Sequence, residues 1–204
     1  MSIVKRISVL LLVLASGIAQ AQERWPFEFW HEGKIVLTGG DTLRGMVKYD
    51  LQQDLVQYSL KDSKPEAFTA RKVMFFEIFD ETVHRYRRFF SLPFAATSPG
   101  YKSMIFFELL EEGKMTLLTR EFLEYKNQNS MYVTYARLVM SYKYFFLKEN
   151  GDIEEFKGSK SDLLDMMGKR SDDVEKFIRK NRLRFEDKDD LTRIIDFYNS
   201  LFES

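Results

Sequence analysis

Apolar and polar residues follow two different periods along this chain, and the change occurs near Gly158. In residues 25–157, apolar positions mostly recur at every second residue or form short continuous runs, a pattern typical of β-strands. Residues 43–50 are the clearest case, since Leu43, Val47 and Tyr49 alternate with mostly polar residues. After Gly158, apolar residues recur at three and four positions, which is the spacing of amphipathic helices.

Turn residues divide the first region into strands. Gly39 and Gly40 predict a hairpin between residues 33–38 and 43–50, because glycine adopts positive φ at little cost. The dipeptide of Asn150 and Gly151 predicts another hairpin after the Tyr- and Phe-rich residues 131–148. The polar residues 124–130 indicate a turn, and residues 72–79 indicate a central strand covered on both faces. Further strands are expected at 54–60, 85–94, 102–110 and 114–120.

Three short helices are expected after Gly158. Ser159 or Ser161 can cap the first helix, Ser171 can cap the second, and the third begins near Asp187 with two further acidic residues. Each apolar stripe is narrow, so we expect these helices to pack on one another or on the sheet.

These elements predict an α+β protein. Its antiparallel β-rich body, residues 22–157, is expected to form a sandwich or a partly open barrel. Residues 158–204 are expected to form a C-terminal cap of three short helices packed on the body.

The first 21 residues have the pattern of a signal peptide. Lys5 and Arg6 precede the uncharged apolar run 7–18, and Ala19 and Ala21 occupy the positions that a signal peptidase reads. The apolar run has 12 residues, whereas a membrane-spanning helix needs about 18 or more. An uncleaved anchor is the alternative, but we expect export, a mature chain that starts at Gln22 and no transmembrane helix after cleavage.

Composition excludes several classes of protein. The 204 residues include no cysteine, which excludes disulfides, Cys-based metal sites and a thiol nucleophile. The 31 basic residues balance the 31 acidic ones, so a strongly basic nucleic-acid binder is not indicated and we expect no nucleic-acid partner.

Candidate catalytic residues are few. The chain has two histidines, and the group of Asp80, Glu81 and His84 lacks the paired-imidazole spacing of a zinc-binding helix, so we expect neither a metal nor a cofactor. The carboxylates that could serve acid–base chemistry are Glu77, Asp80, Glu81, Glu108 and Glu111. Two of them, Glu77 and Glu108, interrupt apolar strands. A buried carboxylate needs a cation, and the candidate partners are Arg85, Arg87 and Arg88.

Aromatic residues are the most unusual feature of the chain, with 19 phenylalanines, 10 tyrosines and two tryptophans. Exposed aromatic side chains favour an apolar ligand, a glycan or a protein partner. Four of them lie close together near the start of the mature chain and form the candidate ligand or partner surface: Trp25, Phe27, Phe29 and Trp30. The alternative is an N-terminal strand tied into the sheet.

Residues 30–50, WHEGKIVLTGGDTLRGMVKYD, resemble the opening of exported proteins of unknown function that are common in Bacteroidota. The ending also resembles that family, with a Tyr- and Phe-rich strand, an Asn-Gly hairpin and a final helix that contains DFYNSL at 196–201. This resemblance implies a Gram-negative envelope, in the periplasm or on the outer surface. It implies no activity and no site residues.

Three functions are therefore open. The first is a non-catalytic envelope protein that binds a partner protein or an apolar ligand through its β body. The second is an envelope hydrolase that uses carboxylates near Glu77, Asp80 or Glu108. The third is an assembly protein that docks through its C-terminal helices.

Overall fold

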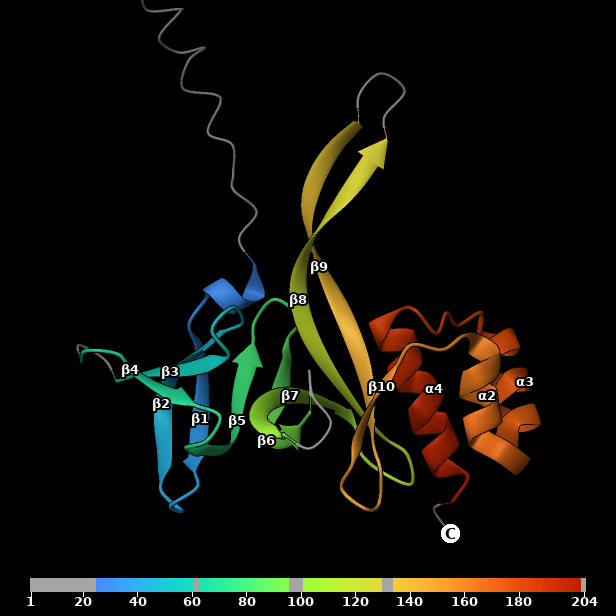
Figure 1. The fold of residues 1–204 in the computed structure, drawn as a ribbon, viewed down its shortest axis with the longest axis horizontal. Helices are drawn as coiled ribbons and strands as arrows, with labels where there is room; N and C mark the ends of the chain where they lie inside the picture. Colours follow the sequence, from blue (N-terminus) through green and yellow to red (C-terminus); the bar gives the residue numbers. More distant parts are fainter. Residues whose placement is uncertain (1–24, 61–62, 96–100, 130–133, 203–204) are drawn as a thin grey trace, which may run out of the picture.

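The computed structural model describes residues 25–60, 63–95, 101–129 and 134–202, so the expected leader at 1–21 lies outside the described residues. Strands dominate the first part of the chain and helices the last part (Figure 1). The first part contains η1 (Pro26–Glu28), β1 (His31–Leu37), β2 (Thr42–Asp50), β3 (Leu55–Ser59), β4 (Glu66–Thr69), β5 (Val73–Asp80), β6 (Arg85–Phe94), β7 (Ser103–Glu111), β8 (Thr116–Asn129), β9 (Thr134–Leu147) and β10 (Ile153–Phe156). The last part contains α2 (Lys160–Met167), η2 (Gly168–Arg170), α3 (Ser171–Asn181) and α4 (Lys188–Ser200). The predicted α+β class, with an antiparallel β-rich body and a C-terminal helical cap, is confirmed.

All ten strands belong to one antiparallel sheet, in the order β4-β3-β2-β1-β5-β6-β7-β8-β9-β10. Neighbouring strands follow one another in the chain except at β1 and β5, where β5 returns to the free edge of β1. The edge strands β4 and β10 are not paired with each other among the described residues, so the sheet is open.

The sheet curls strongly between β2 and β7, as contacts between aromatic rings show. The Tyr49 ring in β2 lies 5.4 Å from Phe89 in β6 and 5.8 Å from Phe106 in β7. A flat sheet would separate β2 and β7 by four strand spacings, or about 19 Å. Of the two arrangements expected from the sequence, the curled sheet therefore corresponds to the partly open barrel.

Three apolar clusters stabilise the molecule. The curled strands enclose the first cluster, which includes Tyr49, Phe76 and Phe106. The second lies between the helices and the parts of β8, β9 and β10 that pair within the sheet, and it includes Leu117 and Phe146. The strand residues of these two clusters lie on the same face of the sheet, which we call the inner face. The third cluster packs on the opposite face, which we call the outer face, around Phe107, Leu118 and Phe145.

Most of the predicted turns and caps are confirmed. Gly40 and Gly151 have φ values of 95° and 81° in the hairpin turns after β1 and β9. Ser159 caps α2 in a reciprocal capping box with Asp162, and Asp187 caps α4 through the backbone N–H groups of the second and third helical residues. The prediction for Ser171 is wrong, because Ser171 is the first residue of α3 and the capping position belongs to Arg170, which makes no side-chain capping bond.

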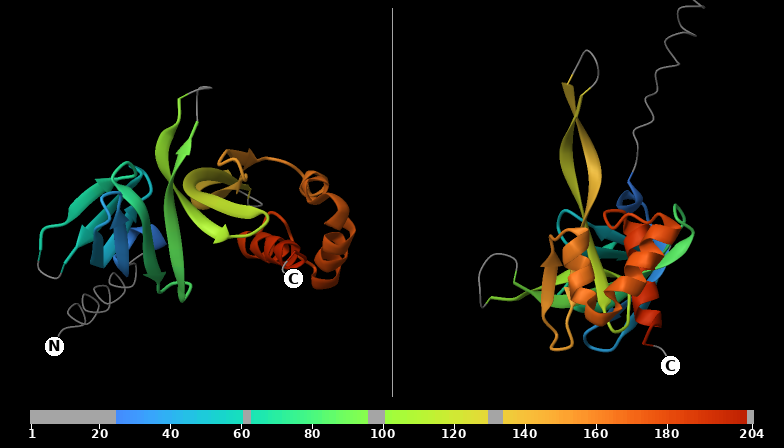
Figure 2. Two further views of the ribbon diagram at one scale, coloured as in Figure 1. Left: turned by 90° about the horizontal axis from the view of Figure 1, so that it is seen from below. Right: turned by 90° about the vertical axis from the view of Figure 1, so that its right-hand side faces the viewer.

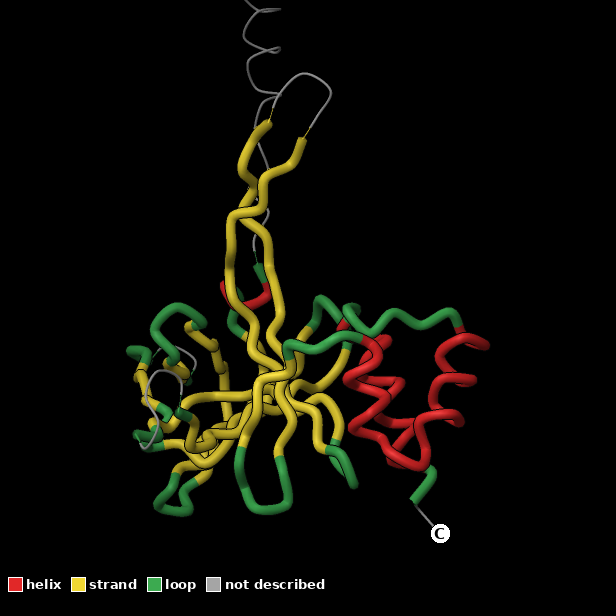
Figure 3. Tube along the Cα trace, turned by 45° about the vertical axis from the view of Figure 1, so that its right-hand side comes forward, coloured by secondary structure: helices red, strands yellow, loops and turns green. Residues whose placement is uncertain are grey.

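The prediction of a turn at 124–130 is wrong, because Glu124 to Asn129 continue β8. From the Arg120–Lys143 pair onward, β8 and β9 pair only with each other, for ten residue pairs. This two-stranded ribbon projects from the rest of the sheet (Figures 1, 2 and 3). Polar residues are tolerated in such a strand because one of its faces meets solvent.

The prediction that β5 is covered on both faces is also wrong. Its inner-face residues Val73, Phe76 and Ile78 are buried, whereas its outer face is half-buried and Met74 is exposed. The apolar run therefore marks a strand of the curled sheet whose outer side chains remain accessible to solvent.

Candidate functional site

A buried network of charges lies on the inner face, between the first and second apolar clusters. Arg87 of β6 is at its centre and is 6% exposed. Its guanidinium donates two parallel hydrogen bonds of 2.8 Å to Glu108 of β7. It also donates to Asp80 at 3.1 Å and to Glu121 of β8 at 2.6 Å. One cation thus holds three carboxylates from three different strands, at β5, β7 and β8.

Lys188, the first residue of α4, completes this network. Its Nζ donates to Glu108 Oε2 at 2.9 Å, lies 3.7 Å from Glu121 Oε1 and lies 5.1 Å from the centre of the Tyr142 ring. A cation is unfavourable at a helix N-terminus, where the helix dipole is positive. The carboxylates of the sheet therefore hold Lys188 there, and the network ties the helical cap to the body.

The electrostatics of the network favour the ionised forms of Asp80 and Glu108. Burial raises the pKa of Glu108, but the charges and hydrogen bonds of Arg87 and Lys188 outweigh burial and bring that pKa below its ordinary value. Burial likewise raises the pKa of Asp80, and hydrogen bonds from Thr82 and Arg87 reverse the effect. The pKa of Arg87 is raised, because its three carboxylate partners outweigh the cost of burial.

A cavity of about 290 Å³ opens beside the network, between the sheet and the start of α4. Asp80, Arg87, Glu121 and Tyr142 line it from the sheet, and Lys188 lines it from α4. Of the carboxylates named as catalytic candidates, Asp80 alone lines this cavity.

The geometry gives these carboxylates little capacity for catalysis. Both oxygens of Asp80 are hydrogen-bonded, to Thr82 and Arg87, and both oxygens of Glu108 are hydrogen-bonded to Arg87, with Lys188 on one of them. A general acid needs a carboxyl of raised pKa and a general base needs a free carboxylate. Asp80 and Glu108 provide neither.

The remaining candidate residues lie apart from this cavity. Glu77 faces the outer side, where it pairs with Lys34 at 2.9 Å and Arg88 at 3.2 Å. Glu81 and His84 form an exposed contact of 3.8 Å in the turn between β5 and β6. Among the described residues, no group of three or more histidine, aspartate or glutamate side chains is arranged to hold a metal ion. Arg87 and Arg88, two of the three expected cation partners, do pair with the strand carboxylates.

The aromatic N-terminal segment closes one end of the curled sheet. The extended arrangement considered for it does not occur, because Pro26–Glu28 form the 3-10 turn η1. His31 Nε2 donates a hydrogen bond to Pro26 O at 2.9 Å, and Phe27 lines a small cavity together with Tyr49 and Phe89. The side chains proposed as a partner surface are all half-buried, namely Trp25, Phe27, Phe29 and Trp30. Their contact with a partner stays a prediction.

The projecting ribbon has two chemically different faces. On the inner face, the pairs that follow Glu121 and Tyr142 carry no charge: Leu123 with Met140, Tyr125 with Leu138, and Asn127 with Ala136. The outer face carries the charged residues, where Glu124 accepts one hydrogen bond from Ser141 and pairs with Lys126 at 3.0 Å. The outer face also carries Tyr135, which is 50% exposed. The helices cover the inner face only as far as Tyr142 and Tyr144. Beyond that point Leu123, Leu138 and Met140 are half-buried, and Tyr125 is 74% exposed.

Side chains stabilise the point where the ribbon leaves the sheet. Phe106 of β7 lies before the first β7–β8 residue pair. Its carbonyl accepts a hydrogen bond of 3.0 Å from Arg120, and its N–H donates to Asp54 at 3.4 Å. Arg120 also pairs with Asp54 at 3.2 Å. Because unpaired backbone groups are costly to bury, this arrangement allows β8 to separate from β7.

Several of these residues were not recognised in the sequence as site residues. Glu121, Tyr142 and Lys188 join the network from distant parts of the chain, and no spacing relates them. The consecutive apolar residues Leu138, Val139 and Met140 were the available signal that a strand continues into the ribbon.

A comparison with protein-family models, curated proteins and solved structures finds no match to this chain.

Proposed function

We propose that this chain is a non-catalytic interaction protein of a bacterial cell envelope, and that the ribbon of β8 and β9 is its contact surface for a partner protein. The observation that carries the proposal is the uncharged inner face of the ribbon, where Tyr125 is 74% exposed and Leu123, Leu138 and Met140 are half-buried. The envelope location rests on the leader-like sequence at 1–21.

The energetics of the ribbon support this role. An isolated two-stranded hairpin is marginally stable in water, because it has too few neighbours to bury its side chains. This ribbon keeps ten residue pairs beyond the sheet and presents leucine, methionine and tyrosine on one side. A partner that covers this side would bury apolar surface that the helices leave exposed. The two ribbon edges also offer unpaired backbone groups to an added strand.

The chemistry of the buried network supports a non-catalytic role. Asp80 and Glu108 are ionised and already hydrogen-bonded, and Glu108 holds α4 on the sheet through Lys188. None of the described helices is long and apolar enough to cross a membrane.

Site-specific photo-crosslinking in the host cell tests the proposal. A photo-reactive residue replaces Tyr125 on the apolar face, and in a matched control it replaces the adjacent Lys126 on the charged face. We expect a discrete crosslinked protein in the envelope fraction from position 125, and at least tenfold less from position 126. The substitution Leu138→Asp is expected to abolish the product, whereas Gln128→Asp on the opposite face preserves it.

Equal crosslinking from both positions, or a product that survives Leu138→Asp, would contradict the proposal. Accumulation of the chain in the cytoplasmic fraction would contradict its envelope location. If the purified protein turns over a substrate and Glu121→Gln abolishes that turnover, the result would favour the hydrolase instead.

A further inference from the structure

Two neighbouring rows of side chains cross the outer face of the N-terminal half of the sheet. The strand register places Arg44, Lys34, Glu77 and Arg88 side by side on β2, β1, β5 and β6, and we call them the charged row. The adjacent row, which we call the aromatic row, contains Met46, Glu32, Phe79 and Tyr86 in the same strand order. Adjacent rows on one face are two residues apart, or about 7 Å.

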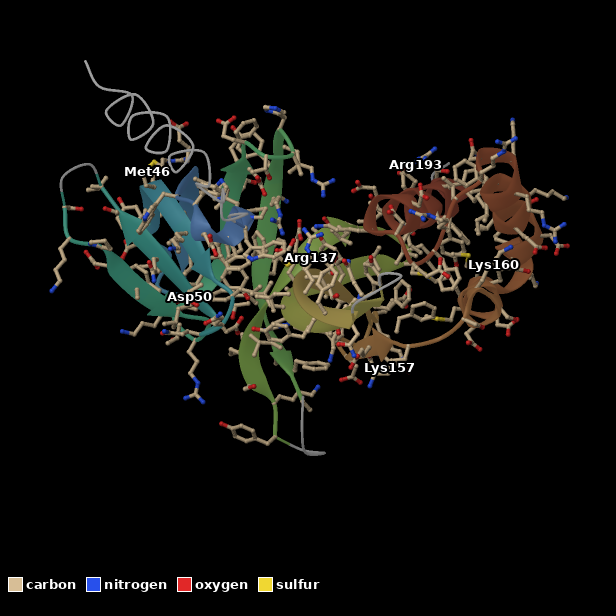
Figure 4. All side chains as sticks on the ribbon, turned by 90° about the horizontal axis from the view of Figure 1, so that it is seen from above. Met46, Asp50, Arg137, Lys157, Lys160 and Arg193 are labelled. Atoms are coloured by element: carbon tan, nitrogen blue, oxygen red, sulfur yellow. The ribbon has the colours of Figure 1, made fainter. Side chains whose placement is uncertain are left out.

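A depression of about 530 Å³ lies over these rows. All residues of both rows except Arg88 line it, together with Gly33, Gly45 and, at the end of β3, Ser59 and Leu60. Figure 4 shows Met46 at the opposite end of the molecule from Lys160 and Arg193 of the helical cap. No residue that lines the depression belongs to the ribbon or to the buried network.

The charged row has an excess of positive charge. Lys34 and Arg88 both pair with Glu77, at 2.9 Å and 3.2 Å. Burial raises the pKa of Glu77, but these two cations outweigh it and lower the pKa overall, so Glu77 is ionised. Arg44 stands directly opposite Lys34 and has no ion-pair partner among the described residues. Like charges in this position repel one another, and an anion placed between them would relieve the repulsion.

The aromatic row offers the opposite charge. Glu32 is exposed and has no ion-pair partner in the described part of the chain. The Phe79 and Tyr86 rings beside it are 5.0 Å apart, and Tyr86 is 68% exposed. A carboxylate next to accessible aromatic rings is an arrangement that attracts an ammonium group, through charge and through the ring faces.

We propose that this depression binds a small zwitterion, with its acidic group at Arg44 and Lys34 and its ammonium group at Glu32, Phe79 and Tyr86. A simple anion fits less well, because it would approach Glu32, and a simple cation would approach Arg44. The row spacing suits a ligand whose two charges are separated by about 4–7 Å. Met46 and Leu60 provide apolar contacts for the part of the ligand between the charges.

Titration of the full chain with phosphocholine, followed through the backbone amide NMR shifts of residues 32–34 and 44–46, tests this site. We expect saturable binding with a dissociation constant on the order of 1 mM, as is usual for a ligand of this size. Choline alone and inorganic phosphate alone should each bind at least tenfold more weakly.

Single-charge variants test each half of the site. Glu32→Gln and Arg44→Gln are expected to weaken phosphocholine binding at least tenfold without altering the fold, because both side chains are exposed. The matched controls Glu66→Gln and Arg71→Gln remove exposed charges outside the depression and should leave binding unchanged. Vesicles of phosphatidylcholine distinguish the source of the ligand, since shifts at the same amides indicate a lipid head group and their absence indicates a free solute.

The proposal is overturned if inorganic phosphate or choline binds as tightly as phosphocholine, since one charge would then suffice. It is also overturned if no probe gives saturable shifts at these amides, or if Glu32→Gln and Arg44→Gln bind as the unchanged chain does. Leu138→Asp on the ribbon should leave this binding intact, so failure here is distinguishable from failure of the proposed function.

Discussion

Arg87 and Glu108 meet through two parallel hydrogen bonds of 2.8 Å in the interior of the protein, where their side chains are 6% and 3% exposed. This pair separates two apolar clusters that share one face of the sheet. Because the same glutamate also binds Lys188 of α4, the pair sets where the helical cap docks.

Replacing Arg87 with methionine should destabilise the protein severely. The substitution preserves apolar volume but leaves Asp80, Glu108 and Glu121 without the central cation. Breaking a buried pair in this way typically costs about 3–5 kcal/mol. The matched change Arg88→Met removes a half-exposed partner of Glu77 and should cost less than about 1 kcal/mol. Urea unfolding of both variants measures the difference in unfolding free energy. Equal losses of stability would show that the buried network contributes no more to stability than the exposed ion pair.

Acid should destabilise the protein through the same network. The folded-state pKa values of Asp80 and Glu108 lie below their ordinary values, so the unfolded chain takes up protons first as the pH falls. Their contribution to stability is present at neutral pH, and it declines below about pH 4.5 and is lost as the pH passes their folded pKa values. Urea midpoints measured from pH 7 to pH 3 should therefore fall with acidity. The Glu108→Gln variant should have a lower urea midpoint at pH 7, and its midpoint should fall less steeply with acidity than that of the unchanged chain. Midpoints that fall in parallel for the two proteins would contradict this account.

Local sequence signals identified much of the fold. The alternation of Val47 and Tyr49, the glycine turns and the Ser159 cap each depend on neighbouring residues, and all are present in the structure. Strand curvature depends on contacts between distant residues, such as Tyr49 with Phe106, so the sequence left a sandwich and a barrel as alternatives.

Less of the candidate site than of the fold could be predicted from the sequence. Glu108 and Arg87 could be expected to form an ion pair, because a carboxylate within an apolar strand needs a cation. Lys188 could not be assigned to it, because 80 residues separate it from Glu108. The ribbon was missed because its polar residues resemble those of a turn, although they occupy the solvent-facing side of paired strands.

Lys188→Met should loosen the cap while leaving the curled sheet folded. Glu108 would lose one of its two cations, and α4 would lose its contact with the sheet at its first residue. We expect amide hydrogen exchange in α4 to increase at least tenfold, with little change in β1, β2 and β5. Lys169→Met, in the turn η2, is the control and should leave exchange in α4 unchanged. Uniform acceleration throughout the chain would mean that cap and body unfold as one unit.

Gly33→Ala should test how tightly β1 packs against β5. A methyl group at Gly33 would clash with the backbone carbonyl oxygen of Glu77, which cannot move without disturbing the strand pairing. Overpacking of this kind typically costs about 1–3 kcal/mol or more. Gly39→Ala is the matched control, since nothing lies within 4 Å of the added methyl group. Thermal unfolding should separate the two variants clearly, and equal melting temperatures would contradict the close approach of these strands.

Removing the ribbon should leave the body folded. Leu123 and Met140 face each other in the register, so residues 124–139 can be replaced by a two-residue Asn-Gly turn that suits a tight hairpin. The removed residues contribute to none of the three apolar clusters. The free energy of unfolding should therefore change by less than about 1 kcal/mol, while the crosslink from the apolar face disappears with the ribbon. A large loss of stability would show that the ribbon supports the fold itself, and the proposal that it is retained for a partner would lose its basis.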